Sequence, residues 1–112
     1  MGDDRLSLAF GALADPTRRA ILQQLLHGEA AVGELAEPFR ISTRAISKHV
    51  AVLEAAGLVT RARDRQRRPS RIRLEPLAEI DEWLSAYRER WEARFDRMGE
   101  NLRRIQAKAE EE

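Results

Sequence analysis

The hydrophobic period of this chain changes twice along its length, and this feature constrains the fold more than any other. Apolar residues recur at helical spacing up to about residue 56, alternate in period two between residues 58 and 74, and return to helical spacing from Pro76. The pattern predicts several short helices, then a two-stranded hairpin, then one long helix. At 112 residues the chain is long enough for one compact domain with a modest core.

Capping and stop residues mark the first two predicted helices. The first covers residues 5–13, where three apolar side chains share one face at i, i+4 and i+7: Leu6, Phe10 and Leu13. Asp15 followed by Pro16 is typical of an N-cap and the first helical position. The second helix is therefore predicted from Pro16 to about His27, and Gly28 supplies a common helix end.

A pair of helices separated by only a few residues follows. The third is predicted over residues 32–39, although Pro38 implies an early end. Ser42 is a good N-cap for the fourth, which covers residues 43–56. The inward row of this fourth helix is Ile46, Val50 and Leu53. The spacing is that of a helix-turn-helix, in which the second helix enters the DNA major groove.

The remaining chain completes a recognisable arrangement. Residues 58–64 and 70–74 alternate in period two around a polar tip that contains Pro69, which predicts a hairpin. From Pro76 a helix of about seven turns is expected. The fold class is thus mainly α with a two-stranded β-hairpin wing, a winged helix-turn-helix. We expect one domain over residues 1–112, in which 32–56 form the helix-turn-helix, 58–75 the wing, and 5–13 and 77–107 dimerisation helices.

The net charge of +1 conceals a strongly polarised chain. Residues 1–39 carry a net −3, residues 40–73 a net +8 and residues 74–112 a net −4. This is the pattern expected when one face of a protein meets a polyanion. Seven arginines fall within 13 residues of the hairpin: Arg61, Arg63, Arg65, Arg67, Arg68, Arg71 and Arg73. Arginine favours forked phosphate contacts or insertion into a narrow minor groove.

Double-stranded DNA is therefore the predicted partner. Once the inward row of the fourth helix is assigned, its outward residues near the N-terminal end are Thr43, Arg44, Ser47 and Lys48. In the hairpin, the expected DNA contacts are Arg63, Arg65, Arg67 and Arg68, with the last two at the tip. The alternative is that these are ordinary exposed residues, and that Arg71 and Arg73 pair with acids of the last helix.

Other classes of function find little support in the sequence. The chain has no cysteine and two histidines, His27 and His49, too few for a closed four-ligand zinc site, so no metal is expected. The sequence contains neither a Gly-rich phosphate loop nor a cysteine nucleophile, so neither an enzymatic activity nor a cofactor is expected. No apolar run is long enough to span a bilayer, and the first residues are acidic where a secretory signal is basic, so a cytoplasmic location is expected.

The last predicted helix carries an apolar stripe that is close to a heptad seam. Four of the six aromatic residues of the chain lie on it: Trp83, Tyr87, Trp91 and Phe95. So long a helix cannot bury its far half on so small a domain, so a second copy is expected to cover it. The expected dimer interface comprises Leu6, Phe10, Leu84, Tyr87, Trp91, Met98 and Leu102. Two alternatives are that these rings pack within one subunit, or that the chain is a protein-interaction module without DNA recognition.

Two copies would place two recognition helices on one side, about 34 Å apart, which is one turn of B-DNA. The expected operator is therefore palindromic.

Three segments of the chain resemble the ArsR-type winged-helix repressors. They are Ala14-Asp15-Pro16-Thr17-Arg18-Arg19-Ala20-Ile21-Leu22, then Val32-Gly33-Glu34-Leu35-Ala36, and the stretch from Ile41-Ser42 through Ala45-Ile46-Ser47-Lys48-His49-Val50 to Leu53-Glu54-Ala55-Ala56-Gly57-Leu58-Val59. The resemblance extends over about residues 5–105. It implies a homodimer that binds operator DNA, usually as a repressor, and that has the first and last helices as its dimer interface.

The resemblance also assigns residues. It places Thr43, Arg44, Ser47, Lys48 and His49 on the recognition helix and Arg67 and Arg68 at the wing tip. From its position beside the inward row alone, His49 is more typical of a packed or capping histidine. Residues 32–36 contain no cysteine and residues 77–112 no histidine, so the chain looks like the metal-independent branch of the family, and its effector is unknown.

Overall fold

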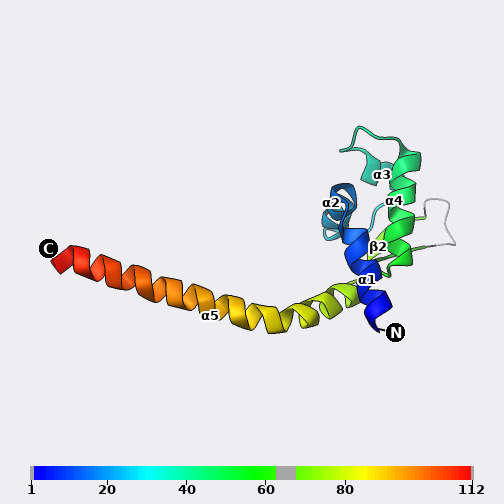
Figure 1. Cartoon of the computed structure of the whole chain (residues 1–112). Coiled ribbons are helices and arrows are strands. Elements are labelled where there is room, and N and C mark those ends of the chain that lie inside the picture. The colour runs from blue at the N-terminus through cyan, green and yellow to red at the C-terminus, as the bar shows by residue number, and fades with distance from the viewer. Residues whose placement is uncertain (1, 63–67, 112) are drawn as a thin grey trace. The chain divides into compact units, whose positions relative to one another are not determined.

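The computed structural model describes residues 2–62 and 68–111, and its element order is that of a winged helix-turn-helix (Figure 1). The elements are α1 (Gly2–Leu13), α2 (Pro16–Leu25), α3 (Val32–Ala36), α4 (Thr43–Ala55), β1 (Val59–Arg61), β2 (Ser70–Ile72) and α5 (Glu75–Glu111). The mainly helical fold class with a two-stranded hairpin is confirmed. The chain divides into two compact units, residues 1–80 and residues 81–112.

Side-chain caps fix where α2 and α4 begin, as the sequence predicts. The Asp15 carboxylate accepts a hydrogen bond from the Arg18 backbone N–H at 3.1 Å, and Pro16 occupies the first turn of α2. The Ser42 hydroxyl accepts one from the Ala45 N–H at 3.1 Å. Gly57, at φ +77°, follows the end of α4 in the left-handed conformation that glycine tolerates.

Several helix boundaries differ from the predicted ones. Helix α1 begins at Gly2 rather than at residue 5, and α2 ends at Leu25, two residues before His27. Helix α3 ends at Ala36 instead of near residue 39, because Pro38 cannot donate the hydrogen bond that would continue it. Helix α5 runs to Glu111, about ten turns at 3.6 residues per turn rather than the seven expected.

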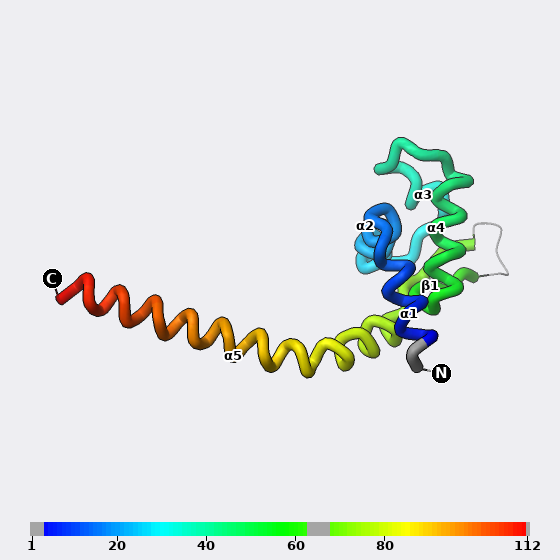
Figure 2. The backbone as a smooth tube through the Cα atoms, in the orientation of Figure 1, coloured from blue at the N-terminus to red at the C-terminus, as the bar shows by residue number. Residues whose placement is uncertain are grey.

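The hairpin is short and gains a third partner that the sequence did not predict. Strands β1 and β2 pair antiparallel, with Val59 opposite Ile72 and Arg61 opposite Ser70. Ala30, between α2 and α3, exchanges two backbone hydrogen bonds with Ser70, at 2.8 and 3.1 Å. Figure 2 traces the backbone through the helices and β1. The extra bridge ties β2 to the segment that precedes the helix-turn-helix.

The core of the first unit lies where α2, α3, α4 and the hairpin meet. Its fully buried aliphatic side chains are Ile21, Leu25, Leu35, Ile46, Val50, Leu53, Leu58 and Val59. The predicted inward row of α4 is therefore confirmed. Each such side chain contributes about 1.5–3 kcal/mol through its removal from water. The core fixes which face of α4 remains outside.

Helix α1 contacts this core mainly through its small residues. Ala9 and Ala12 are buried, while Leu6 and Leu13 are half-buried and Phe10 is 38% exposed. Small alanines let the helix backbone approach the core closely, so the larger side chains are left at the edge of the contact.

Residues 81–111 form one exposed stretch of helix. Its rings pair along the helix, Trp83 with Tyr87 at 4.9 Å between centroids and Trp91 with Phe95 at 5.7 Å. Asp81 accepts a hydrogen bond from Arg88, which raises the pKa of that guanidinium. None of the helices in the described part of the chain has an apolar stretch that could cross a membrane.

Candidate nucleic-acid interface

The N-terminal half of α4 presents polar and cationic side chains opposite its buried row. Thr43, Arg44 and Lys48 are exposed, and Ser47 and His49 are half-buried. The first backbone N–H groups of α4 point out of the N-terminal end of the helix, where they favour a negatively charged ligand. All five predicted recognition-helix residues thus lie on α4, and three of them are exposed.

Arg40 is an exposed cation that the sequence-based site omitted. It lies in the turn before α4, two residues ahead of the cap Ser42. The only signal for it was its place at the start of the basic third of the chain. It adds positive charge beside the N-terminus of the recognition helix.

Arg61 points inward, whereas Arg68, Arg71 and Arg73 are exposed. Its Nη2 donates to the Ser47 carbonyl oxygen at 3.1 Å, and its Nε lies 3.9 Å from a Glu54 oxygen. Only 13% of the side chain is exposed. Arg61 therefore braces the first wing strand against the middle of α4, and fixes the position of the wing relative to the recognition helix.

Arg71 and Arg73 are both paired with acids. Arg73 lies 3.5 Å from Glu75, the first residue of α5, as the alternative interpretation predicts. The prediction of a last-helix partner is wrong for Arg71, whose partner is Glu29 at 3.4 Å. The reason is the bridge between Ala30 and Ser70, which brings the residue before Ala30 next to the residue after Ser70.

The wing tip is only partly described. Arg63, Arg65 and Arg67, three of the predicted DNA contacts, lie outside the described residues. Arg68 is exposed and adopts φ +46°, a conformation that costs a non-glycine residue of order 1–3 kcal/mol. The next residue, Pro69, is buried, and its carbonyl accepts the Ala62 N–H at 3.0 Å. That hydrogen bond closes the hairpin behind Arg68.

Arg18 contacts α1 and α4 from the first turn of α2. Its guanidinium donates to the carbonyls of Ala12 at 2.6 Å and Gly11 at 3.1 Å, and lies 3.4 Å from the His49 ring. The hydrogen bond from its backbone N–H is the largest cause of a lowered pKa for the Asp15 carboxyl. The cap is therefore charged at neutral pH. Sequence reasoning named Arg18 only within the family resemblance and assigned it no role.

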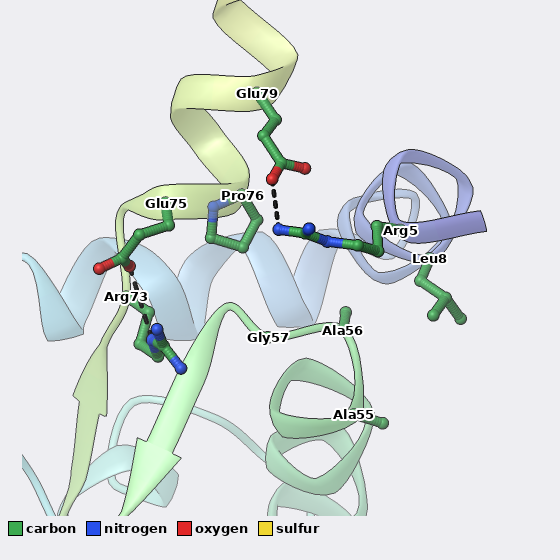
Figure 3. A pocket seen from close by; sticks show the side chains of 9 residues that line it. All are labelled: Arg5, Leu8, Ala55, Ala56, Gly57, Arg73, Glu75, Pro76 and Glu79. Atoms are coloured by element: carbon green, nitrogen blue, oxygen red, sulfur yellow. Dashed lines mark hydrogen bonds and ion pairs between the residues drawn. The ribbon is translucent and has the colours of Figure 1, made fainter. Parts of the chain in front are cut away.

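A small pocket of about 240 Å³ lies between α1, the C-terminal end of α4 and the start of α5 (Figure 3). Arg5 pairs with Glu79 across it, and Arg73 pairs with Glu75 at its edge. Both cations in its lining are thus neutralised by carboxylates. The pocket offers no unbalanced charge to an anion and stands apart from the exposed face of α4.

Among the described residues, no three histidine, aspartate or glutamate side chains gather closely enough to hold a metal ion.

Comparisons with known proteins place these features in a family. Residues 13–62 match the family model of a helix-turn-helix domain. The chain is 55% identical over 51 residues to the HTH-type transcriptional regulator Rv2034 of Mycobacterium tuberculosis, covering 46% of this chain and 48% of that protein. It is 43% identical over 51 residues to the transcriptional repressor SdpR of Bacillus subtilis, covering 46% of this chain and 57% of that one. The chain thus spans about half the length of the curated relatives it matches.

Solved structures extend the likeness to most of the chain. The crystal structure of the ArsR family transcriptional regulator RHA00566 is 40% identical, with a TM-score of 0.72 over 79% of this chain and 97% of that one. The homodimeric winged helix-turn-helix DNA-binding domain of Mb0332 from Mycobacterium bovis is 28% identical, with a TM-score of 0.61 over 77% of this chain and 80% of that one. These relatives are described as regulators of transcription and not as enzymes. The chain belongs to the ArsR family of winged helix-turn-helix transcriptional regulators.

Proposed function

We propose that this chain binds a palindromic operator as a homodimer and represses transcription. The observation that carries the proposal is the exposed face of α4. Thr43, Arg44 and Lys48 stand free at the N-terminal end of a helix whose opposite face is locked into the core. A helix held in this way can enter the major groove and present short hydroxyls and long cations to base edges and phosphates.

Each segment of the chain has its own role in this proposal. Residues 32–56 are the helix-turn-helix and residues 58–75 the wing. The DNA contacts are Thr43, Arg44, Ser47, Lys48, His49, Arg63, Arg65, Arg67 and Arg68, with Arg40 added from its exposure. SdpR is named a repressor, which supports the direction of regulation. Arg61, Arg71 and Arg73 already have partners within the chain. We therefore assign the DNA contacts of the wing to the arginines at its tip.

Dimerisation is proposed through residues 5–13 and 77–107. The domain of Mb0332 is homodimeric, which supports this assignment. On residues 81–111 the apolar side chains are all well exposed in the single chain: Leu84, Tyr87, Trp91, Phe95, Met98, Leu102 and Ile105. Such a series of exposed apolar side chains is typical of an interaction surface. In the first unit, Leu6 of α1 is half-buried and Phe10 is exposed.

The spacing of this stripe favours an antiparallel partner of the same sequence. From Leu84 through Trp91 to Met98 the apolar residues follow one another at intervals of three, four, four and three. The series is the same in both directions, so a second copy running the opposite way sets Leu84 against Met98, Tyr87 against Phe95, and Trp91 against itself. A two-fold axis at Trp91 makes every layer apolar.

Selection from a pool of randomised duplex DNA tests the operator prediction. A two-fold dimer with two recognition helices is expected to enrich inverted repeats whose half-sites are centred one helical turn, about 34 Å, apart. The bound species is expected to contain two chains per duplex. Enrichment of single half-sites at one chain per duplex contradicts the homodimer on DNA, and a pool that shows no enrichment contradicts sequence-specific binding.

A further inference from the structure

Arg18, a residue of α2, contacts both α1 and α4 with its side chain. It sits in the first turn of α2 and donates Nε and Nη2 to the carbonyls of Ala12 and Gly11, in the last turn of α1. Its Nη1 lies 3.4 Å from Nδ1 of His49, which is part of α4. One side chain therefore joins the first helix to the recognition helix.

These contacts are worth more than ordinary surface contacts. The last carbonyls of a helix lack partners within the helix, so a side chain that satisfies them stabilises that end. Hydrogen bonds from a charged donor are roughly twice as strong as neutral ones. Arg18 and His49 are both half-buried, which limits competition from water. The guanidinium fork can reach two carbonyls and a ring at once, which the single ammonium of a lysine cannot.

The contact also bears on which nitrogen of the neutral His49 ring carries the proton. A guanidinium has no acceptor atom and stays charged in proteins, so Arg18 can only donate in this pair. A hydrogen bond between the two therefore requires Nδ1 of His49 as the acceptor, with the proton of the neutral ring on Nε2. His49 is left with one N–H donor, on a partly exposed ring one residue from Lys48.

We propose that Arg18 is a positioning residue for DNA binding, which holds α4 in place against α1 and fixes His49 as the Nε2–H tautomer. The inference rests on the proposed function, because it assigns α4 and His49 to the DNA. Arg18 itself does not touch DNA in this account. Since α1 is also a proposed dimerisation helix, Arg18 links the dimer interface to the recognition helix.

The tautomer is tested on the unaltered protein by nitrogen NMR of its imidazole rings. The chain has only two histidines, and His27 is exposed, so it serves as the reference within the same spectrum. At a pH where both rings are neutral, His49 is expected to show an unprotonated Nδ1 and a protonated Nε2. A His49 ring protonated at Nδ1 overturns the proposal, whether or not any variant folds.

The positioning role is tested with matched variants. Arg18→Ala is expected to weaken operator binding at least tenfold and to change the His49 tautomer ratio. Arg19→Ala is the control, because Arg19 also donates to the end of α1, to the Leu13 carbonyl at 2.7 Å, and is exposed. Its operator affinity is expected to stay within twofold of the unaltered chain. Equal losses in the two variants overturn the proposal.

A double-mutant cycle separates the link from general loss of structure. If Arg18 acts through His49, Arg18→Ala costs little further affinity once His49→Ala is present. Additive losses overturn the proposal while leaving the DNA-binding function intact. A chain that binds no operator contradicts the proposed function instead, and the NMR measurement then still decides whether Arg18 fixes His49.

Discussion

A chain that carries Arg44→Ala together with Lys48→Ala is expected to bind its operator about 30-fold more weakly, or worse. Both side chains are exposed on the proposed DNA face of α4, and neither forms an ion pair with an acid in the described part of the chain. A good base contact contributes about 1–3 kcal/mol, and 1.4 kcal/mol is a factor of ten in affinity. Fluorescence anisotropy on the selected operator measures the loss.

The matched control for this pair is Arg103→Ala with Arg104→Ala. It removes the same charge from exposed positions of α5, outside the proposed DNA face. Its operator affinity should change only by the small amount that total charge imposes. If the two double variants lose affinity equally, the recognition helix has been assigned wrongly and binding is a matter of net charge.

Trp91→Glu is expected to raise the dimer dissociation constant by about three orders of magnitude. Trp91 is 63% exposed in the single chain and lies at the centre of the symmetric stripe, so both partners lose its contact in the dimer. A central interface residue of this kind contributes about 2 kcal/mol or more from each side. Two opposed carboxylates at the axis add repulsion. Sedimentation velocity over a concentration series measures the constant.

Ala93→Glu is the matched control, because it adds the same charge two residues away on the opposite face of α5. It should leave the dimer intact. If the chain still dimerises with Trp91→Glu, α5 is not part of the dimer interface.

Disulfide trapping tests whether the two α5 helices of the dimer run antiparallel. Because the chain has no native cysteine, only the introduced thiols can cross-link. An equimolar mixture of Leu84→Cys and Met98→Cys chains should cross-link, because the two positions face each other about the Trp91 axis. Leu84→Cys alone should remain free, since its two copies lie far apart along antiparallel helices. Rapid cross-linking of Leu84→Cys with itself would establish a parallel pair instead.

Local signals in the sequence were enough to predict the framework of the fold. The caps Asp15 and Ser42 mark helix starts through chemistry that involves only three or four neighbouring residues. The buried row of α4 follows from helical periodicity, and its exposed face follows from the buried one. The exposure of Thr43, Arg44 and Lys48 could be predicted for this reason.

What the sequence could not predict depends on contacts between distant segments. Period two places Arg61 with the other wing arginines, but only the packing of β1 on α4 turns it toward Ser47. Ala30 pairs with Ser70 as an isolated bridge, so no alternation of apolar and polar residues predicts the contact. Arg18 reaches α1 and α4 only because those helices cross beside it. Each of these residues has a role set by tertiary geometry.

The most direct test of the central claim is an anisotropy titration of the purified chain on the DNA upstream of its own gene, with scrambled competitor and a salt series. The account predicts tight binding that survives the competitor and weakens steeply with salt, because the arginines and lysines displace counterions from phosphates. Weak binding that the scrambled DNA removes equally well would contradict a sequence-specific regulator at this site, and would instead favour a protein-interaction module that acts through the aromatic face of α5.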